Sequence, residues 1–260
     1  MLLDLTFTSD EKEFRIPKAN LHLFQAMLYD LLPKAFSTFL HNEGFRFKNR
    51  RFKLFAFSWP RGAGKPSFTE NSIIFNYPIR LTVATPVHPT MEGIAEGALQ
   101  KTRIRIGNNH VFCTEILLRE YEPTGETLDV YTLSPITCYS TLYKKTGEPY
   151  TLYHTPQDSE FASQISENLH RKFKSLYPDT PAPEGAVTFS TSGNVREQVA
   201  IFKPDDPRPI KAWWGRFTLH GPAELLQTAL DCGLGAKNSA GFGCVEPARE
   251  RTNSVQERRL

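Results

Sequence analysis

The stretch GLGAKNSAGFGCVE, residues 233–246, places four glycines within eleven residues and then enters an apolar segment. Glycine in such numbers costs backbone entropy, so we expect a geometric reason for it. One interpretation is a plain turn between a helix and a strand. The other is close approach of another molecule, because uncovered backbone N–H groups beside Lys237 would form an anion cradle. Both interpretations stay open at this point.

The segments around this stretch follow a regular order. A helix is predicted over 222–232, before the glycines, and a strand over 242–246, after them. Further upstream, alternation predicts a strand over 128–133, and one apolar face predicts an amphipathic helix over 158–177. The other predicted strands of this half are 186–190, 198–202 and 210–219.

The first half of the chain has a similar order. A strand is predicted over 2–7 and helical periodicity covers 20–40, with Asn20 as its N-cap. Pro33 interrupts that periodicity, so we predict two helical pieces. The other predicted elements are a strand-like alternating segment within 45–59, strands over 72–77, 79–84 and 111–118, and a helix over 91–101.

Each half therefore approximates strand–helix–strand–strand–helix–strand. We predict an α+β fold made of tandem ferredoxin-like (RRM-like) βαββαβ domains with a C-terminal glycine-rich loop. The turn-rich sequence YEPTGETLD at 121–129 marks the boundary between them. This gives an N-terminal domain at 1–122, a C-terminal domain at 123–246 and a polar, frayed tail at 247–260.

Composition sets broad limits on the class of protein. The chain of 260 residues has 40% hydrophobic and 23% charged residues and a net charge of +3, which is ordinary for a globular protein. Such a charge tolerates an anionic partner without demanding one. No apolar run is long enough to cross a bilayer and no secretory signal is evident, so we expect no membrane partner and a cytoplasmic location.

A metal site is not predicted. The four cysteines have no CxxC spacing, and the seven histidines have no HxH or HxxxH spacing. The motif RGAGKPS at 61–67 is also not a phosphate loop, because Trp59 stands where the first glycine would be. We interpret it as a flexible basic loop.

A basic cluster interleaved with phenylalanines lies at 45–55. One interpretation is a solvated strand with its apolar residues turned inward, and the other is a positive surface for phosphates with aromatic rings for stacking. His41 lies just before the cluster, and a histidine beside cations can transfer protons near a phosphodiester. The basic residues are Arg46, Lys48, Arg50, Arg51 and Lys53.

The glycine stretch resembles the C-terminal signature of the CRISPR-associated RAMP proteins. LHNEGFRFKNRRFKLFAFS at 40–58 and AMLYDLLPKAFSTFLH at 26–41 are similar to segments of the family within this group that cleaves precursor CRISPR RNA in its repeats. The middle of the chain, roughly 60–230, matches only by its order of strands and helices.

The resemblance implies two ferredoxin-like domains with a cleft between them and an endoribonuclease that needs no metal or cofactor. The RNA 2′-hydroxyl attacks its own 3′ phosphate, which leaves a 2′,3′-cyclic phosphate and a 5′-hydroxyl. It assigns acid/base work to His41, proton exchange or substrate orientation to Tyr29, and phosphate stabilisation to Lys48. Arg46, Arg50 or Arg51 could take the place of Lys48.

The assignment makes a geometric demand. On one unbroken helix Tyr29 and His41 would lie about 18 Å apart along the axis, so they can meet only if Pro33 breaks the helix. The glycine loop is expected against RNA or against the N-terminal domain. The full set of predicted RNA-binding residues is Arg46, Arg50, Arg51, Lys53, Gly233, Gly235, Lys237, Gly241 and Gly243.

The implied partner is CRISPR repeat RNA within precursor CRISPR RNA. Subunits of a CRISPR effector complex and a second copy of the chain are further possible partners. The alternative is a catalytically inactive RAMP protein that binds repeat RNA as a structural or effector-complex subunit.

Overall fold

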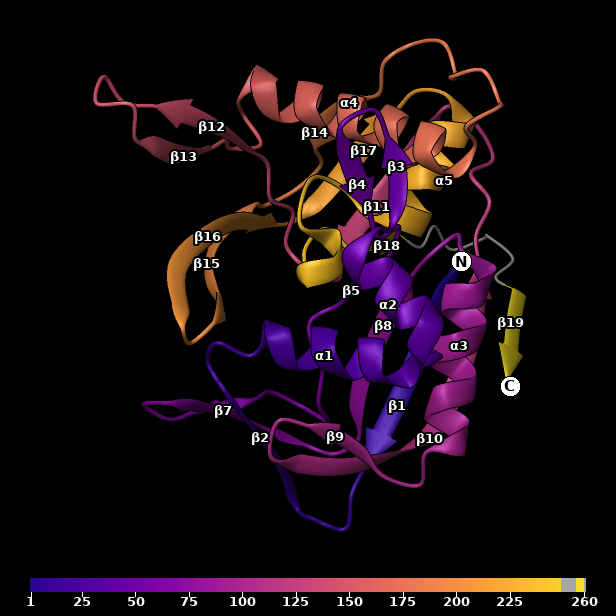
Figure 1. The fold of residues 1–260 in the computed structure, drawn as a ribbon, viewed down its shortest axis with the longest axis vertical. Coiled ribbons are helices and arrows are strands. Elements are labelled where there is room, and N and C mark those ends of the chain that lie inside the picture. Colours follow the sequence, from indigo (N-terminus) through magenta and orange to yellow (C-terminus); the bar gives the residue numbers. More distant parts are fainter. Residues whose placement is uncertain (249–255, 260) are drawn as a thin grey trace.

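A computed structural model describes residues 1–248 and 256–259 of the chain and shows two α+β units joined near residue 122 (Figure 1). Each unit has a core of its own. In the first, two large rings, Phe7 and Phe24, are fully buried, and in the second Phe161 and Phe217 are. The two cores follow from the apolar periodicities of the helices and strands in each half.

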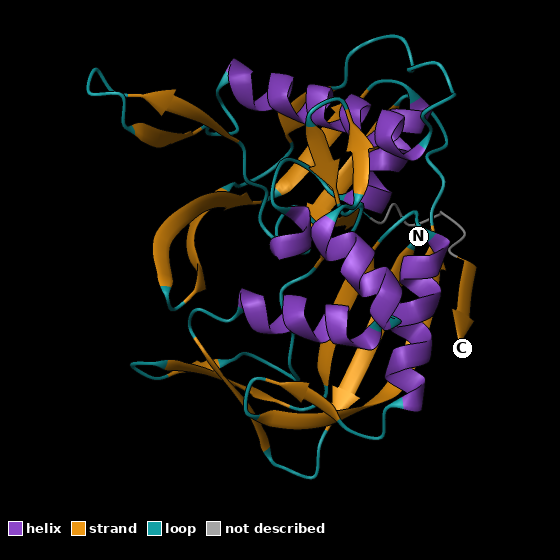
Figure 2. Ribbon diagram, in the orientation of Figure 1, coloured by secondary structure: helices purple, strands orange, loops and turns teal. Residues whose placement is uncertain are grey.

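The first unit has the ferredoxin-like order. Its sheet runs β10-β1-β8-β5, so that the first and third strands in sequence are central. The helices cover one face of this sheet (Figure 2). The elements are β1 (Leu2–Thr8), α1 (Leu21–Leu31), α2 (Lys34–Asn42), β5 (Ala56–Phe57), β8 (Ile79–Ala84), α3 (His88–Gln100) and β10 (Asn109–Glu120).

The second unit repeats this order. Its sheet runs β14-β17-β11-β18, again with the first and third strands central. The tandem ferredoxin-like fold predicted from the sequence is therefore confirmed. The elements are β11 (Thr127–Thr132), α4 (Ser159–Leu176), β14 (Thr188–Thr191), β17 (Arg216–His220), α5 (Ala223–Cys232) and β18 (Val245–Pro247).

Both units also contain short strands outside the two main sheets. A three-stranded sheet has the order β2-β7-β6, β9 pairs with β10, and three hairpins join β3 to β4, β12 to β13 and β15 to β16. Their bounds are β2 (Glu13–Pro17), β3 (Phe45–Phe47), β4 (Arg50–Phe52), β6 (Ser67–Phe68), β7 (Ser72–Asn76), β9 (Ile104–Ile106), β12 (Tyr139–Tyr143), β13 (Pro149–Tyr153), β15 (Arg196–Lys203) and β16 (Asp206–Trp214).

Three local predictions need correction. The segment within 45–59 is a tight β3–β4 hairpin followed by a separate strand, because the chain reverses at Lys48, which has φ 50°. The strand predicted over 210–219 is divided between β16 and β17 at Gly215. The tail is not frayed throughout, since β19 (Gln256–Arg259) pairs antiparallel with β10. Residues 249–255 and 260 of the predicted tail lie outside the described residues.

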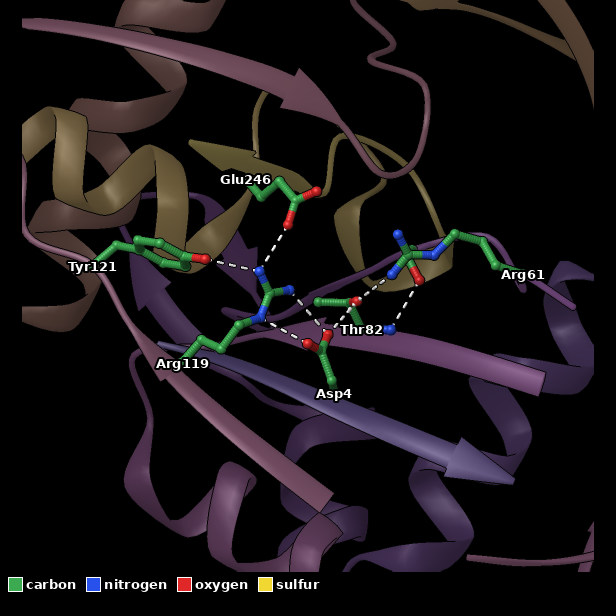
Figure 3. Close-up of polar contacts among 7 residues, drawn as sticks. Asp4, Arg61, Thr82, Arg119, Tyr121 and Glu246 are labelled. Atoms are coloured by element: carbon green, nitrogen blue, oxygen red, sulfur yellow. Dashed lines mark hydrogen bonds and ion pairs between the residues drawn. The ribbon is translucent and has the colours of Figure 1, made fainter. Parts of the chain in front are cut away.

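Polar contacts join the two units (Figure 3). Arg119 on β10 is almost fully buried and forms ion pairs with Asp4 on β1 at 2.7 Å and with Glu246 on β18 at 2.8 Å. Its guanidinium also donates to the hydroxyl of Tyr121, 2.8 Å away. A buried ion pair fixes geometry more reliably than it adds stability. Arg119 therefore sets how strand β18 sits against the first sheet.

In the part of the chain that the structure describes, no helix has both the length and the apolar character that a bilayer crossing would require.

Candidate functional site

Tyr29 and His41 meet where the chain turns between two helices. Helix α1 ends at Leu31, and Leu32 and Pro33 are extended, with ψ of 150° and 134°. Helix α2 then starts at Lys34 in a new direction. The rings of Tyr29 and His41 lie edge to face, with centroids 5.9 Å apart. The break at Pro33 thus supplies the convergence that a single helix would forbid.

The environment of Tyr29 fixes its chemistry. Its ring packs edge to face on the buried Phe55, with centroids 5.9 Å apart. Burial raises the pKa of the Tyr29 phenol to about 12. Near neutral pH the phenol is therefore protonated and can donate a hydrogen bond, whereas its phenolate is not populated.

His41 lies in the last turn of α2 with its side chain exposed. Its Nδ1 is 2.9 Å from the Asn42 amide oxygen. When Nδ1 carries a proton it can donate to this oxygen, and Nε2 is then the ring nitrogen available to a substrate. An exposed imidazole with one oriented nitrogen is suited to exchange protons with a bound substrate.

Two cations lie under the C-terminal end of α2. Lys53 Nζ donates to the carbonyl oxygens of His41, at 2.7 Å, and Leu40. Arg51 donates to the carbonyl oxygen of Asn42 at 3.0 Å. Burial, and then the charge of Arg51, lower the pKa of Lys53. Positive charge is favourable at a helix C-terminus, and here it also raises the potential beside His41.

The structure places Lys48 elsewhere. It forms the tip of the β3–β4 hairpin, where its Nζ lies 5.5 Å from the ring centre of Phe47. The strand Phe45–Phe47 carries Lys48 about 10 Å away from the base of the hairpin. Lys53, on the returning chain, is the lysine in contact with His41. The reversal at the tip was not predicted from the sequence, and the role assigned to Lys48 stays a prediction.

The outward face of this hairpin concentrates positive charge. Arg46 and Arg51 are direct cross-strand partners, and like charges in that position repel. Glu43 only reaches Arg46 at 4.0 Å. On the opposite face Phe45 and Phe52 pack in a cluster with Cys232 of the second unit, and Arg50, the partner of Phe47, also belongs to that face. An anion between Arg46 and Arg51 would relieve their repulsion.

The glycine loop has a structural explanation. Gly233, Gly235, Gly241 and Gly243 are buried with φ between 67° and 88°. A Cβ on Gly235 would meet the Thr137 carbonyl oxygen at 2.5 Å, and one on Gly241 would meet the Phe57 ring at 2.9 Å. Protein atoms therefore fill the space beside these glycines, and contact of the loop with RNA stays a prediction.

The loop is held against the N-terminal unit, as the alternative in the sequence analysis expected. The Trp59 indole donates to the carbonyl oxygen of Gly241 at 2.8 Å, and the Gln25 amide donates to that of Ser239 at 2.6 Å. The short 3-10 helix η1 (Asn238–Ala240) forms its tip. Lys237, exposed just before η1, is the part of the loop that faces solvent.

A separate cavity of about 690 Å³ lies between the two units. Its lining includes Glu120, Glu122, Glu224 and Asp231, and it includes none of the residues that the sequence analysis selected. These four carboxylates would repel the negatively charged phosphate backbone of a nucleic acid. We also find no cluster of three or more potential metal ligands among the described residues.

Comparison with known proteins gives one consistent family. The family described as "CRISPR associated protein Cas6, C-terminal" matches residues 118–247, which is half of the chain. A Pyrococcus furiosus protein named "CRISPR-associated endoribonuclease Cas6" is 27% identical over 98% of this chain and 92% of its own length. A Methanocaldococcus jannaschii protein, "CRISPR-associated endoribonuclease Cas6 1", is 24% identical over 81% of this chain and 78% of its own.

A solved structure shares the fold. The structure described as "Characterization of a Cas6-related gene from Pyrococcus furiosus" superposes with a TM-score of 0.81 over 96% of this chain and 99% of the other, at 17% identity.

Proposed function

The chain belongs to the Cas6 family of CRISPR-associated proteins, and from this membership we propose that it is an endoribonuclease that cuts CRISPR repeat RNA. The Pyrococcus furiosus relative, which matches nearly the full length of this chain, is named an endoribonuclease. Precursor CRISPR RNA is its substrate and mature guide RNA its product. The cytoplasm is the proposed location, and the proposed domain bounds are 1–122 and 123–246, with 247–260 as tail.

The observation that carries the chemistry is the contact between Tyr29 and His41, with centroids 5.9 Å apart. The 2′-oxygen of the RNA forms a bond to the adjacent phosphorus as the bond to the 5′-oxygen breaks, without a metal. One proton leaves the 2′-hydroxyl and one reaches the 5′-oxygen. His41 exchanges one of these protons, and the neutral phenol of Tyr29 donates a hydrogen bond that orients the phosphate.

Positive charge near the pentavalent phosphorus comes from the β3–β4 hairpin. Lys53 and Arg51 carry it beside His41, and we now propose Lys53 for the role that the family resemblance gave to Lys48. Lys48 at the tip, with Arg46 and Arg50, contacts phosphates further along the strand. Lys237 adds a phosphate contact from the glycine loop. Effector-complex subunits and a second copy of the chain stay as proposed partners.

The test uses labelled cognate repeat RNA with excess EDTA. Wild-type protein should cut it, a substrate with a single 2′-deoxy at the cut site should survive, and His41→Ala should cut far more slowly. Binding of the repeat with no cleavage by the wild type would assign the protein to the inactive RNA-binding RAMP class. Undiminished cleavage by His41→Ala would keep the nuclease and remove His41 from its mechanism.

A further inference from the structure

The hairpin β12–β13 projects away from both units (Figure 1). Every residue from 141 to 152 is exposed, and Tyr143 retains 71% of its surface. A two-stranded hairpin with no packed face is marginal by itself in water. Exposed aromatic surface in such a place is typical of a binding function.

The strand register sorts the side chains of this hairpin into two different faces. Tyr139 is paired with Tyr153, and Tyr143 with Pro149, so these rings share one face. The rings of Tyr139 and Tyr153 lie 5.8 Å apart. We call Tyr139, Tyr143 and Tyr153 the tyrosine face. Leu142 and Leu152 belong to the opposite face together with a further tyrosine, Tyr150, because side chains alternate along a strand.

Neighbouring segments bring positive charge to the tyrosine face. Lys237 from the glycine loop places its Nζ 5.3 Å from the ring centre of Tyr139. The Tyr153 hydroxyl donates to the Pro209 carbonyl oxygen at 3.0 Å, which ties β16 to the hairpin beside Arg208. Arg208 is neutralised by Asp206. The ion pairs among the described residues include neither Lys237 nor Lys145, which lies in the hairpin turn.

We infer that the tyrosine face is a stacking platform for a single-stranded segment of RNA outside the nucleotides at the cut. Bases stack on Tyr143 and its neighbours, while Lys237 and Lys145 contact the flanking phosphates. Rings interspersed with uncompensated cations are the pattern by which proteins hold single strands without reading sequence. This inference rests on the proposed function for the identity of the RNA, and on the hairpin geometry for its place.

The test separates stacking from charge with two probes: a 12-nucleotide single-stranded RNA and the same backbone with abasic positions. Fluorescence anisotropy gives Kd for each. Tyr143→Ala should raise Kd for the base-bearing probe roughly 5- to 100-fold and leave Kd for the abasic probe unchanged. Tyr143→Phe keeps the ring and should keep the wild-type Kd. Lys145→Ala should weaken binding of both probes.

Phe68→Ala is the matched control, because Phe68 on β6 is similarly exposed, at 67%, and lies outside every site described above. It should leave both Kd values unchanged. An unchanged Kd in Tyr143→Ala would overturn the inference, as would equal weakening by Phe68→Ala. A change in sedimentation with no change in Kd would also overturn it and make the hairpin a protein interface. The inference can fail while wild-type protein still cuts repeat RNA, so its failure is distinct from failure of the proposed nuclease.

Discussion

Tyr29 and His41 lie edge to face with ring centroids 5.9 Å apart, although they belong to different helices twelve positions apart. The contact exists because Leu32 and Pro33 are extended between α1 and α2. Two residues that touch each other and the same substrate are expected to act as a unit, so their contributions to the rate should not add.

We expect His41→Ala to lower the single-turnover cleavage rate about 10²- to 10⁴-fold, which is the range for loss of a general acid or base. Tyr29→Phe keeps the ring packing and removes only the hydroxyl, so it should have a smaller effect. The double variant should be hardly slower than His41→Ala. Rates measured on repeat RNA with enzyme in excess check this, and fully additive effects would contradict the shared role.

The raised pKa of Tyr29, about 12, predicts how its variant responds to pH. A group whose pKa is raised stays protonated throughout the range below that value. Tyr29→Phe should therefore lower the cleavage rate by the same factor at every pH between 6 and about 10. A pH–rate profile that loses a limb within this range in Tyr29→Phe would show instead that the phenol gives up its proton.

Substitution of Lys53 should lower the cleavage rate, whereas substitution of Lys48 should weaken RNA binding. Lys53→Met removes the charge that bonds the His41 carbonyl, so we expect a lower cleavage rate at saturation and reduced stability. Lys48→Met removes one exposed cation from the hairpin tip. It should weaken binding uniformly and reduce the salt slope of log K by about 1. Equal losses of rate in both variants would contradict the placement of Lys53 as the lysine of the site.

Gly243→Ala tests the packing of the glycine loop. Its φ is 69°, and a Cβ there would overlap the carbonyl oxygen of Leu234. We expect a loss of about 3 kcal/mol or more in the free energy of unfolding, because backbone must move. Gly64→Ala is the control, since Gly64 has φ 82° with nothing within 4 Å. It should lose only about 1–2 kcal/mol. Urea unfolding of both variants measures the two losses. Equal losses would mean that backbone strain alone accounts for the effect at Gly243, and a larger loss there would show the cost of overlap with Leu234.

The buried Lys172 predicts how the free energy of unfolding depends on pH. Its buried Nζ donates to the Gly233 carbonyl oxygen at 2.7 Å, and burial lowers its pKa to about 8. The unfolded chain, with the ordinary pKa near 10.4, holds more proton between these values. The contribution of Lys172 to the free energy of unfolding is therefore complete above the unfolded pKa, where the side chain is neutral in both states. It is lost as the pH falls through the folded pKa of about 8.

The comparison is with Lys172→Met, which has no proton to bind. The unfolding free energy of wild type minus that of the variant should rise by about 1.4 kcal/mol per pH unit above pH 8. Urea titrations at four values from pH 7.5 to 10 measure the slope. A difference independent of pH would show that Lys172 has the same pKa in the folded and unfolded chains.

The sequence by itself determined the helices and the central strands β1, β8 and β11, because their apolar periodicities decide the type of each element. The central strand β17 was predicted only as part of a longer strand over 210–219. It also determined the break at Pro33, since a proline cannot continue a helix interior. From that break and the spacing of Tyr29 and His41, their convergence could be predicted. The family could be recognised because its two motifs are local in sequence.

Only the tertiary structure decided which lysine reaches His41 and what the glycines do. The hairpin at Lys48 depends on one residue with φ 50°, which no periodicity signals. The contact between Lys53 and the His41 carbonyl oxygen therefore could not be predicted from sequence spacing. Gly235 and Gly241 face atoms of Thr137 and Phe57, distant in sequence. A glycine needed for close packing and a glycine needed for a ligand have the same sequence pattern. The neighbours that distinguish them come together only when the chain folds.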